Sequence, residues 1–389
     1  MIPVSTALAN LLDLVAPLKI EQVPLAQAAG RVLAENLSAN RDQPPFAASA
    51  MDGYAVNRAE LELHAMFKVI GESAAGHRFD GRVGAGQAVR IFTGAPVPEG
   101  ADCVVIQENV DRKGSLITIV DQPSDSTYIR PAGGDFKRGD VVQAPKRLAP
   151  ADVALLAAMN IATVPVRRKP DIALISTGDE LVMPGDTPGP DQIIASNTFG
   201  LKAMLEGFGA NARILPIARD QKPALEAAFN LAKDADLVVT IGGASVGDHD
   251  LVSDVAQDLG MEQSFYKVAM RPGKPLMGGR MGDAAMVGLP GNPVSAMVCG
   301  HVFLKPMVDQ MLGLVSEPAL KTAPLTEDLT ANGPRAHYMR ATLGPKGIAP
   351  CQNQDSSLLS VLSGANALLI RPPHDDAREA GETVSYLPL

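Results

Sequence analysis

Four loops of this 389-residue chain concentrate the residue types that bind phosphates, oxyanions and hard metal ions. Residues 177–181 read TGDEL, residues 242–250 read GGASVGDHD, residues 267–275 read KVAMRPGKP, and residues 289–295 read LPGNPVS. Glycine lets the backbone approach a ligand closely, whereas carboxylates and fixed cations supply charge. One such loop alone could be an ordinary turn, but four together predict a binding site.

Carboxylates are the first chemical group in these loops. Asp179, Glu180, Asp248 and Asp250 supply hard oxygen ligands, and no His or Cys stands at metal-ligand spacing. Such a set suits Mg²⁺, which commonly also binds substrate phosphates. Glu180, Asp248 and Asp250 are among these candidate metal ligands. The alternative is that these acids are solvated side chains at the starts of helices.

Fixed cations are the second group. Lys267, Arg271 and Lys274 could together hold an oxyanion or a phosphate. Pro272 and Pro275 stiffen their loop, which favours a preorganised site over a solvated loop.

The other polar side chains of these loops have open roles. Asn292 could cap a helix, recognise a flat amide-bearing ligand, or do both. Ser245 could donate a hydrogen bond to a phosphate or a ring. His249 has neither the spacing nor the nucleophile elbow of a Ser-His-Asp triad. The further candidate ligand-binding residues are Thr177, Gly178, Asp179, Gly242, Gly243, Gly247, Pro290 and Gly291.

Strands alternating with helices position these loops. The pattern predicts strands at 172–176, 212–217, 237–241, 264–268 and 284–289, and helices at 196–208, 223–233, 251–259 and 294–311. Alternation of this kind predicts a parallel, doubly wound sheet, whose ligands bind beyond the carboxyl ends of the strands. The four loops are therefore expected on one rim of the sheet.

The flanking sequence predicts further parts. Helices are expected at 5–16, capped by Ser5, at 27–37 and at 150–160, while short strands with Gly and Pro turns predict a β module at 47–139. Residues 318–389 predict a small β-barrel. The expected domains are a helical part at 1–46 plus 140–169, the inserted β module at 47–139, an α/β domain at 170–317, and the barrel at 318–389.

Composition excludes several classes of protein. A net charge of −9 without a Lys/Arg cluster argues against nucleic acid as the main partner. Three scattered cysteines argue against a disulfide framework and a zinc site, and Cys299 is expected to be packed in a core. The apolar N-terminal residues lack the features of a signal peptide, and the longest apolar stretch is too short to span a bilayer. We expect a cytoplasmic protein.

The motifs resemble one family, the molybdopterin molybdenumtransferases of the MoeA and gephyrin E-domain type. The resemblance follows the family's order across nearly the whole chain and is looser only in the C-terminal unit. It is carried by SAMDGYAV at 49–56, TGA at 93–95, RPAGGD at 130–135, STGDEL at 176–181, GGASVGDHD at 242–250, RPGKP at 271–275 and LPGNPVS at 289–295.

The resemblance implies a molybdopterin-binding α/β domain and a homodimer whose active site lies between subunits. It implies that molybdate is ligated to adenylylated molybdopterin with Mg²⁺, and that AMP and molybdenum cofactor are released. The implied catalytic residues are Asp52, Thr93, Glu180, Asp250, Lys267, Arg271 and Lys274, and the implied further contacts are Arg130, Asp135, Arg340 and Ser356. Asp52 and Thr93 would face the other chain. The molybdopterin adenylyltransferase and recipient apo-molybdoenzymes are the implied protein partners.

Two alternatives stay open at this point. One is a non-catalytic carrier or scaffold for molybdopterin or the finished cofactor, and the other is a tungstate-inserting homologue. The chain also departs from the family's usual pattern at two positions. Arg271 stands where many members have Lys, which changes the donor geometry, and Asp355 precedes Ser356 where Gly is usual.

Overall fold

The structure is a computed structural model that describes residues 1–242, 251–315 and 320–389. The chain forms two compact units. The larger comprises Met1–Glu21, Gly30–Ala34 and Val166–Leu389, and the smaller comprises Gln22–Ala29 and Glu35–Pro165. The predicted division into four domains is finer than this and stays a prediction.

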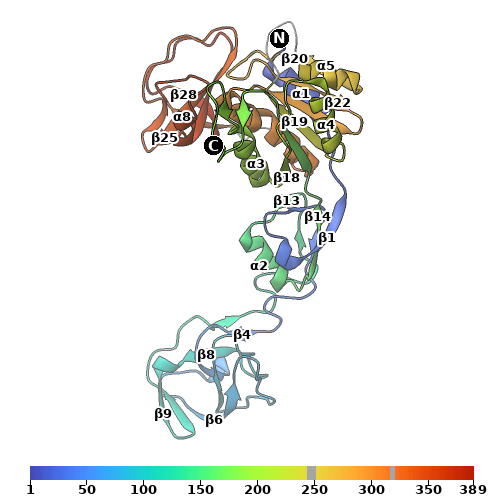
Figure 1. Cartoon of the computed structure of the whole chain (residues 1–389). Helices are drawn as coiled ribbons and strands as arrows, with labels where there is room; N and C mark the ends of the chain where they lie inside the picture. The colour runs from blue at the N-terminus through green and yellow to red at the C-terminus, as the bar shows by residue number, and fades with distance from the viewer. Residues whose placement is uncertain (243–250, 316–319) are drawn as a thin grey trace. The chain divides into compact units, whose positions relative to one another are not determined.

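A six-stranded sheet forms the centre of the larger unit (Figure 1). Its order is β18 (Asn211–Ile214), β15 (Asp171–Ser176), β19 (Leu237–Ile241), β23 (Ala284–Leu289), β22 (Met277–Met281) and β20 (Met261–Tyr266). The first four strands are parallel, as predicted. The last two add antiparallel pairs, which the sequence analysis did not predict, because a two-residue turn joins β22 to β23.

Helices cover both faces of this sheet. Along β15, Ile172 and Leu174 contribute to one apolar core while Ala173 and Ile175 contribute to the other, as expected for side chains that alternate along a strand. The first core contains residues of α1 (Val4–Leu12), α3 (Asn197–Phe208), α6 (Pro293–Cys299) and α7 (Lys305–Met311). The second contains residues of α4 (Lys222–Ala232) and α5 (Leu251–Asp258).

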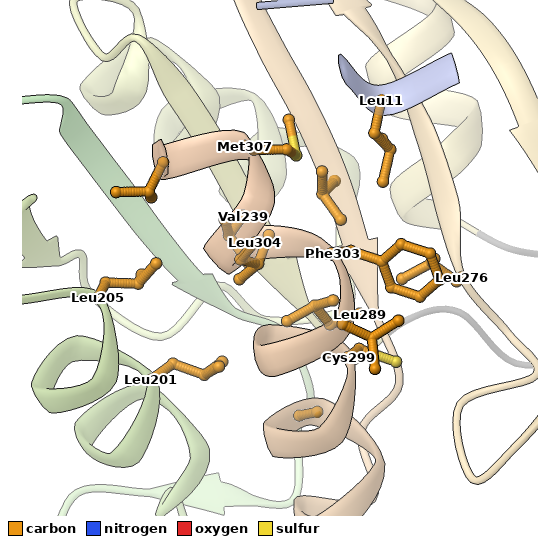
Figure 2. Packing of buried hydrophobic residues seen from close by; sticks show 14 of the residues in the cluster. Leu11, Leu201, Leu205, Val239, Leu276, Leu289, Cys299, Phe303, Leu304 and Met307 are labelled. Carbon is orange, nitrogen blue, oxygen red and sulfur yellow. The ribbon is translucent and has the colours of Figure 1, made fainter. Parts of the chain in front are cut away.

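Figure 2 shows the first core from close by. Leu201 and Leu205 of α3 belong to the same buried cluster as Leu304, Cys299 and Leu289. Cys299 is fully buried, which confirms the packed role expected for it. A π-helical turn, Gly300–Leu304, joins α6 to α7, so the predicted helix at 294–311 is present as one run with a local irregularity.

A second sheet of the larger unit occupies the segment at 318–389 for which a small β-barrel was predicted. Its order is β21 (Met270–Arg271), β25 (Ala336–Gly344), β27 (Ala367–Arg371), β28 (Thr383–Pro388) and β24 (Lys321–Pro324), with β26 (Gly347–Pro350) paired to β25. β21 belongs to the cationic loop predicted from the sequence, so this sheet holds that loop in place. A short helix, α8 (Leu359–Gly364), follows the loop around residue 356.

The smaller unit contains the predicted β module. Its six-stranded sheet has the order β8 (Cys103–Ile106), β5 (Gly53–Val56), β7 (Gln87–Ile91), β6 (Met66–Ser73), β10 (Leu116–Ile119) and β9 (Val110–Lys113). Beside it β4 (Ala48–Ser49) pairs with β11 (Ile129–Arg130), and α2 (Pro150–Ala158) corresponds to the helix expected at 150–160.

Two local predictions were wrong. Residues 27–37 are not a helix, because Gly30 adopts a left-handed conformation with φ +75° and short strands follow it. Ser5 does not cap α1, since that helix already begins at Val4 after Pro3. The remaining short elements are β1 (Ile20–Pro24), η1 (Leu25–Gln27), β2 (Val32–Leu33), β3 (Leu37–Ser38), η2 (Arg58–Glu60), η3 (Gln107–Asn109), β12 (Val141–Val142), β13 (Lys146–Arg147), β14 (Thr163–Arg167), β16 (Leu181–Val182) and β17 (Ile193–Ile194).

Across the described ranges, no helix is both long enough and apolar enough to cross a membrane.

Candidate functional site

A pocket of about 940 Å³ lies in the larger unit, where the parallel strands end. The predicted residues that line it are Thr177, Gly178, Glu180, Gly242, Lys274, Pro290, Gly291 and Asn292. Residues after β15, β19 and β23 thus meet at one rim, as the sheet topology predicted. The volume falls in the range typical of small-molecule sites.

Gly242 allows the strand ends to approach one another closely. Its φ is +98°, and a Cβ placed on it would lie 2.7 Å from the carbonyl oxygen of Thr177. Its amide donates to the carbonyl of Leu289 at 3.2 Å, and the amide of Thr177 donates to the carbonyl of Ile241 at 3.0 Å. The neighbouring Gly291 lies against Gly242 without any positive φ. Gly242 is therefore required by geometry, whereas Gly291 is not.

Thr177 places an unpaired polar atom beside the pocket. The residue is 2 % exposed, and its hydroxyl has no hydrogen-bond partner among the described residues. A buried polar group without a hydrogen-bond partner destabilises the fold, and a ligand can remove this cost by supplying the missing hydrogen bond. This observation fits the predicted ligand-binding role of Thr177.

A cluster of carboxylates occupies one side of the rim. The carboxylate of Glu180 folds over Gly178, since a Cβ on that glycine would lie 2.4 Å from Glu180 Oε2. The carboxylate of Asp179 accepts a hydrogen bond from the amide of Asp220 at 3.3 Å. Burial raises the pKa of Asp220, and repulsion from Asp179 and Glu180 raises it further. Negative charge is therefore concentrated here.

Asp220 lines the pocket but was missed by the sequence analysis. It follows β18, and Arg219 beside it donates to the carbonyl of Asp179 at 2.6 Å. The signal was available, because Asp220 comes shortly after a predicted strand of a parallel sheet. Asn197 and Ser357 also line the pocket and were also missed. The side-chain amide of Asn197 donates to the carbonyl of Gly291 at 2.7 Å.

Of the three predicted cations, Lys274 alone lines the pocket among the described residues. Arg271 pairs in β21 with His337 of β25. Lys267 has φ +71°, and its Nζ lies 4.8 Å from the ring centroid of Tyr266. The three side chains thus share one loop, but Lys267 and Arg271 lie outside the described pocket lining.

Backbone hydrogen bonds fix the cationic loop from two sides. The amide of Ile2 donates to the carbonyl of Lys267 at 3.1 Å, and the amide of Ala269 donates to the carbonyl of Ile2 at 2.8 Å. The amide of Ala336 donates to the carbonyl of Ala269 at 3.0 Å. Within the loop, the amide of Val268 donates to the carbonyl of Lys274 at 3.0 Å. The loop is therefore held in one conformation before any ligand binds.

Asn292 and Ser356 contact each other. Asn292 occupies the N-cap position of α6, but its side chain makes no capping hydrogen bond. Instead its amide donates to Ser356 Oγ at 3.1 Å. The capping role considered from the sequence is therefore wrong for the side chain. Ser357, rather than Ser356, lines the pocket.

Arg340 supports the loop that carries these serines. It is 1 % exposed, its guanidinium donates to the carbonyl of Asp355 at 2.7 Å, and it donates to the side chain of Gln354 at 3.2 Å. Burial lowers the pKa of Arg340. Its position beside the pocket, rather than in it, suits a residue that orders the loop.

The predicted residues of the smaller unit form their own group. The amide and the hydroxyl of Thr93 donate to Asp52 Oδ1 at 2.7 and 2.8 Å. These two hydrogen bonds lower the pKa of Asp52, and the charge of Arg90 lowers it further. Arg130, in β11, and Asp135 are both exposed in the same unit. Asp52 and Thr93 are thus brought together, with the hydroxyl and amide of Thr93 fixing the Asp52 carboxylate.

Comparison with known proteins identifies the chain's relatives. Three family models match it in order: the MoeA N-terminal region (domain I and II) at residues 2–160, a probable molybdopterin binding domain at residues 173–310, and the MoeA C-terminal region (domain IV) at residues 322–389. A molybdopterin molybdenumtransferase from Haemophilus influenzae is 35 % identical over 96 % of this chain and 94 % of its own length. The chain belongs to the molybdopterin molybdenumtransferase family.

Other relatives agree with this membership. A molybdopterin molybdenumtransferase from Bacillus subtilis is 33 % identical over 99 % of this chain and 94 % of its own. A crystal structure of a molybdopterin biosynthesis MoeA protein from Pyrococcus horikoshii has a TM-score of 0.84 at 30 % identity, covering 100 % of this chain and 99 % of that one. The predicted family, its fold and a transferase function in molybdenum cofactor biosynthesis are therefore confirmed.

Several predicted residues of this family member lie outside the described residues. These are Gly243, Ser245, Gly247, Asp248 and Asp250. Within the part of the chain that the structure describes, no group of three or more His, Cys, Asp or Glu side chains is arranged to hold a metal ion. The metal set predicted from Glu180, Asp248 and Asp250 therefore stays a prediction.

Proposed function

We propose that this protein joins molybdate to adenylylated molybdopterin in the pocket at the carboxyl ends of β15, β19 and β23. Water cleaves the phosphoanhydride of the adenylylated substrate and AMP leaves, while the dithiolene sulfurs of molybdopterin replace oxygen ligands of molybdate, which leave as water. The observation that carries this proposal is one pocket that combines Lys274 with Glu180 and the unpaired hydroxyl of Thr177, in the segment matched by a probable molybdopterin binding domain.

The charges of the pocket suit the substrates. Molybdate and the substrate phosphates are anions, which Lys274 and the polar rim of the pocket would bind. Lys267 and Arg271 would add positive potential from the same loop, without lining the described part of the pocket. Arg340 and Ser356 would order the loop through which Ser357 reaches the ligand. In this assignment the rigid cationic loop provides a preorganised environment for the leaving anion.

The carboxylates fit a divalent cation. Mg²⁺ usually takes one or two protein carboxylates together with phosphate oxygens and waters, so a cage of three protein ligands is not required. Glu180 and Asp220 both place carboxylate oxygens in the pocket, and the pKa of Asp220 is raised by burial and by the neighbouring charges of Asp179 and Glu180, which a cation would neutralise. When bound, Mg²⁺ would neutralise negative charge on the substrate phosphates. Asp248 or Asp250 is proposed as the other protein carboxylate beside Glu180, and substrate phosphate and water would supply the remaining ligands.

The assembly is also part of the proposal. Asp52 and Thr93 are proposed to act in a homodimer, in which they face the α/β domain of the second chain. Arg130 and Asp135 would contact substrate from the same unit. The molybdopterin adenylyltransferase would supply the substrate and apo-molybdoenzymes would receive the product, in the cytoplasm. The size of the dimer is measurable by light scattering.

A turnover assay tests the function directly. Purified protein is mixed with adenylylated molybdopterin, Mg²⁺ and molybdate, and AMP release is followed together with activation of an apo-molybdoenzyme. Molybdate-dependent AMP release with activation is the expected result. Tight binding without AMP release would refute catalysis and indicate a carrier. Faster release with tungstate would instead assign the protein to tungsten.

A further inference from the structure

A short parallel ribbon forms an apolar wall of the pocket. It consists of β16 and β17, in which Leu181 is paired with Ile193 and Val182 with Ile194. The amide of Ile193 donates to the carbonyl of Glu180 at 2.8 Å, and the amide of Ala195 donates to the carbonyl of Val182 at 2.9 Å. The ribbon is therefore tied directly to the carboxylate side of the rim.

The register of the ribbon selects which side chains share a face. Residues paired in neighbouring strands project to the same side, and successive residues along a strand project to opposite sides. Leu181 and Ile193 therefore share one face, and both line the pocket. On the other face Val182 does not line the pocket, whereas its partner Ile194 does. Leu181 and Ile193 are therefore the pair whose two side chains both line the pocket, with Ile194 adding to the same apolar wall.

This apolar face is exposed to solvent. Ile193 is 58 % exposed although its side chain is large and branched. Pro275 and Pro290 contribute further apolar lining, whereas Glu180 and Lys274 place charge in the same pocket. A pocket with an apolar wall and a charged rim suits a ligand that carries a flat, apolar-faced ring and an anionic group.

We propose that Leu181 and Ile193 form a platform on which a planar bicyclic nitrogen heterocycle of the substrate packs. This inference rests on the proposed function, whose substrate contains two such rings, the pterin and the adenine. A ring lying on the platform covers Ile193 from water and leaves the phosphates toward Lys274 and Glu180. The ribbon thus sets both the orientation of the substrate and its selectivity for a ring-bearing phosphate.

Equilibrium binding to the full-length protein tests the platform. The probes are AMP, 6-hydroxymethylpterin phosphate and ribose 5-phosphate, which has a phosphate but no ring. They are titrated calorimetrically into the unmodified protein, Ile193→Ala and Ile193→Leu. Leu231→Ala is the matched control, because Leu231 is an exposed leucine of the same unit at 53 % exposure and does not line the pocket.

The expected result is a five- to tenfold weaker affinity of Ile193→Ala for one ring-bearing probe, roughly the effect of removing apolar contacts covered on one side. Ribose 5-phosphate should bind unchanged, and Ile193→Leu and Leu231→Ala should keep the original affinities. A loss for AMP assigns adenine to the platform, and a loss for the pterin phosphate assigns the pterin. Both outcomes support the proposal.

The platform is refuted if Ile193→Ala binds both ring-bearing probes as well as the unmodified protein does. Equal weakening of ribose 5-phosphate, or no binding of either ring-bearing probe to the unmodified protein, would refute it too. These outcomes are separate from the turnover assay. Ring-dependent binding without molybdate-dependent AMP release would retain the platform and reject the proposed reaction.

Discussion

Replacement of Gly242 by alanine is the sharpest test of the site's geometry. The added Cβ would lie 2.7 Å from the carbonyl oxygen of Thr177 and 3.1 Å from its hydroxyl. Neither atom can move easily, because the amide of Thr177 is bonded to β19 and the residue is buried. The backbone of Gly242 also has φ +98°, which side chains disfavour.

Two contributions set the expected magnitude. A non-glycine residue in the left-handed region costs about 1–2 kcal/mol, and an added methyl in a tightly packed place costs about 1–3 kcal/mol. Gly242→Ala should therefore lower the free energy of unfolding by about 3 kcal/mol. For a unit of this size, that loss corresponds to a fall in melting temperature of about 6–12 °C.

Gly291→Ala is the matched control. Gly291 lines the same pocket, but its φ is not positive and its added Cβ would meet only Gly242 Cα, at 3.6 Å. Scanning calorimetry of both variants without ligand measures stability independently of binding. We expect Gly291→Ala to melt within about 1 °C of the unmodified protein. Equal melting temperatures for the two variants would refute the close approach described for Gly242.

Three further predictions concern charge, pH and the cationic loop. Lys274→Ala should abolish molybdate-dependent AMP release while Lys321→Ala, an exposed lysine of β24, retains it; activity in both would reject Lys274 as a ligand contact. Burial lowers the pKa of His337 to about 4, and four nearby arginines contribute to this decrease. The free energy of unfolding is therefore highest above the unfolded-state pKa of about 6.5 and falls as the pH drops toward 4. Denaturant titrations should show that the free energy of unfolding falls by about 3 kcal/mol over that pH range because of His337. His337→Gln should remove this pH dependence, and a variant that keeps it would contradict the assignment. Ile2→Pro removes the amide that bonds to Lys267 and should raise the KM for molybdate several-fold, whereas Ile2→Ala, which keeps that amide, should not; equal values would contradict the bracing of the loop.

The sequence was sufficient to predict the parallel sheet and the rim that carries the site. Short apolar, β-branched runs such as residues 237–241 predict buried strands. In a parallel sheet the loops that follow such strands lie together at one edge. Asp220 was missed because its strand ends in an ordinary polar segment without glycine. The capping role considered for Asn292 was wrong, since its side chain contacts Ser356, 64 residues away, and no local pattern reveals that contact.

Other failures also have a non-local cause. The antiparallel edge of the sheet depends on a turn at Gly282 that resembles a simple loop. The stretch at 27–37 has helical composition, but Gly30 and pairing of its short strands override that propensity. The sequence did not predict that Ile193 lines the pocket, because its position depends on the pairing with Leu181 across a loop.

The cationic loop is joined by hydrogen bonds to Ile2 at one end of the chain and to Ala336 near the other. During synthesis the loop leaves the ribosome well before residue 336 exists, so its second support is then missing. The anion-binding geometry can therefore be completed only after the C-terminal sheet has formed. A chain that ends before residue 336 would keep the strands that carry most of the pocket residues, but it would lack Ser357 and the second support of the cationic loop, so we expect incomplete products to bind the substrate more weakly.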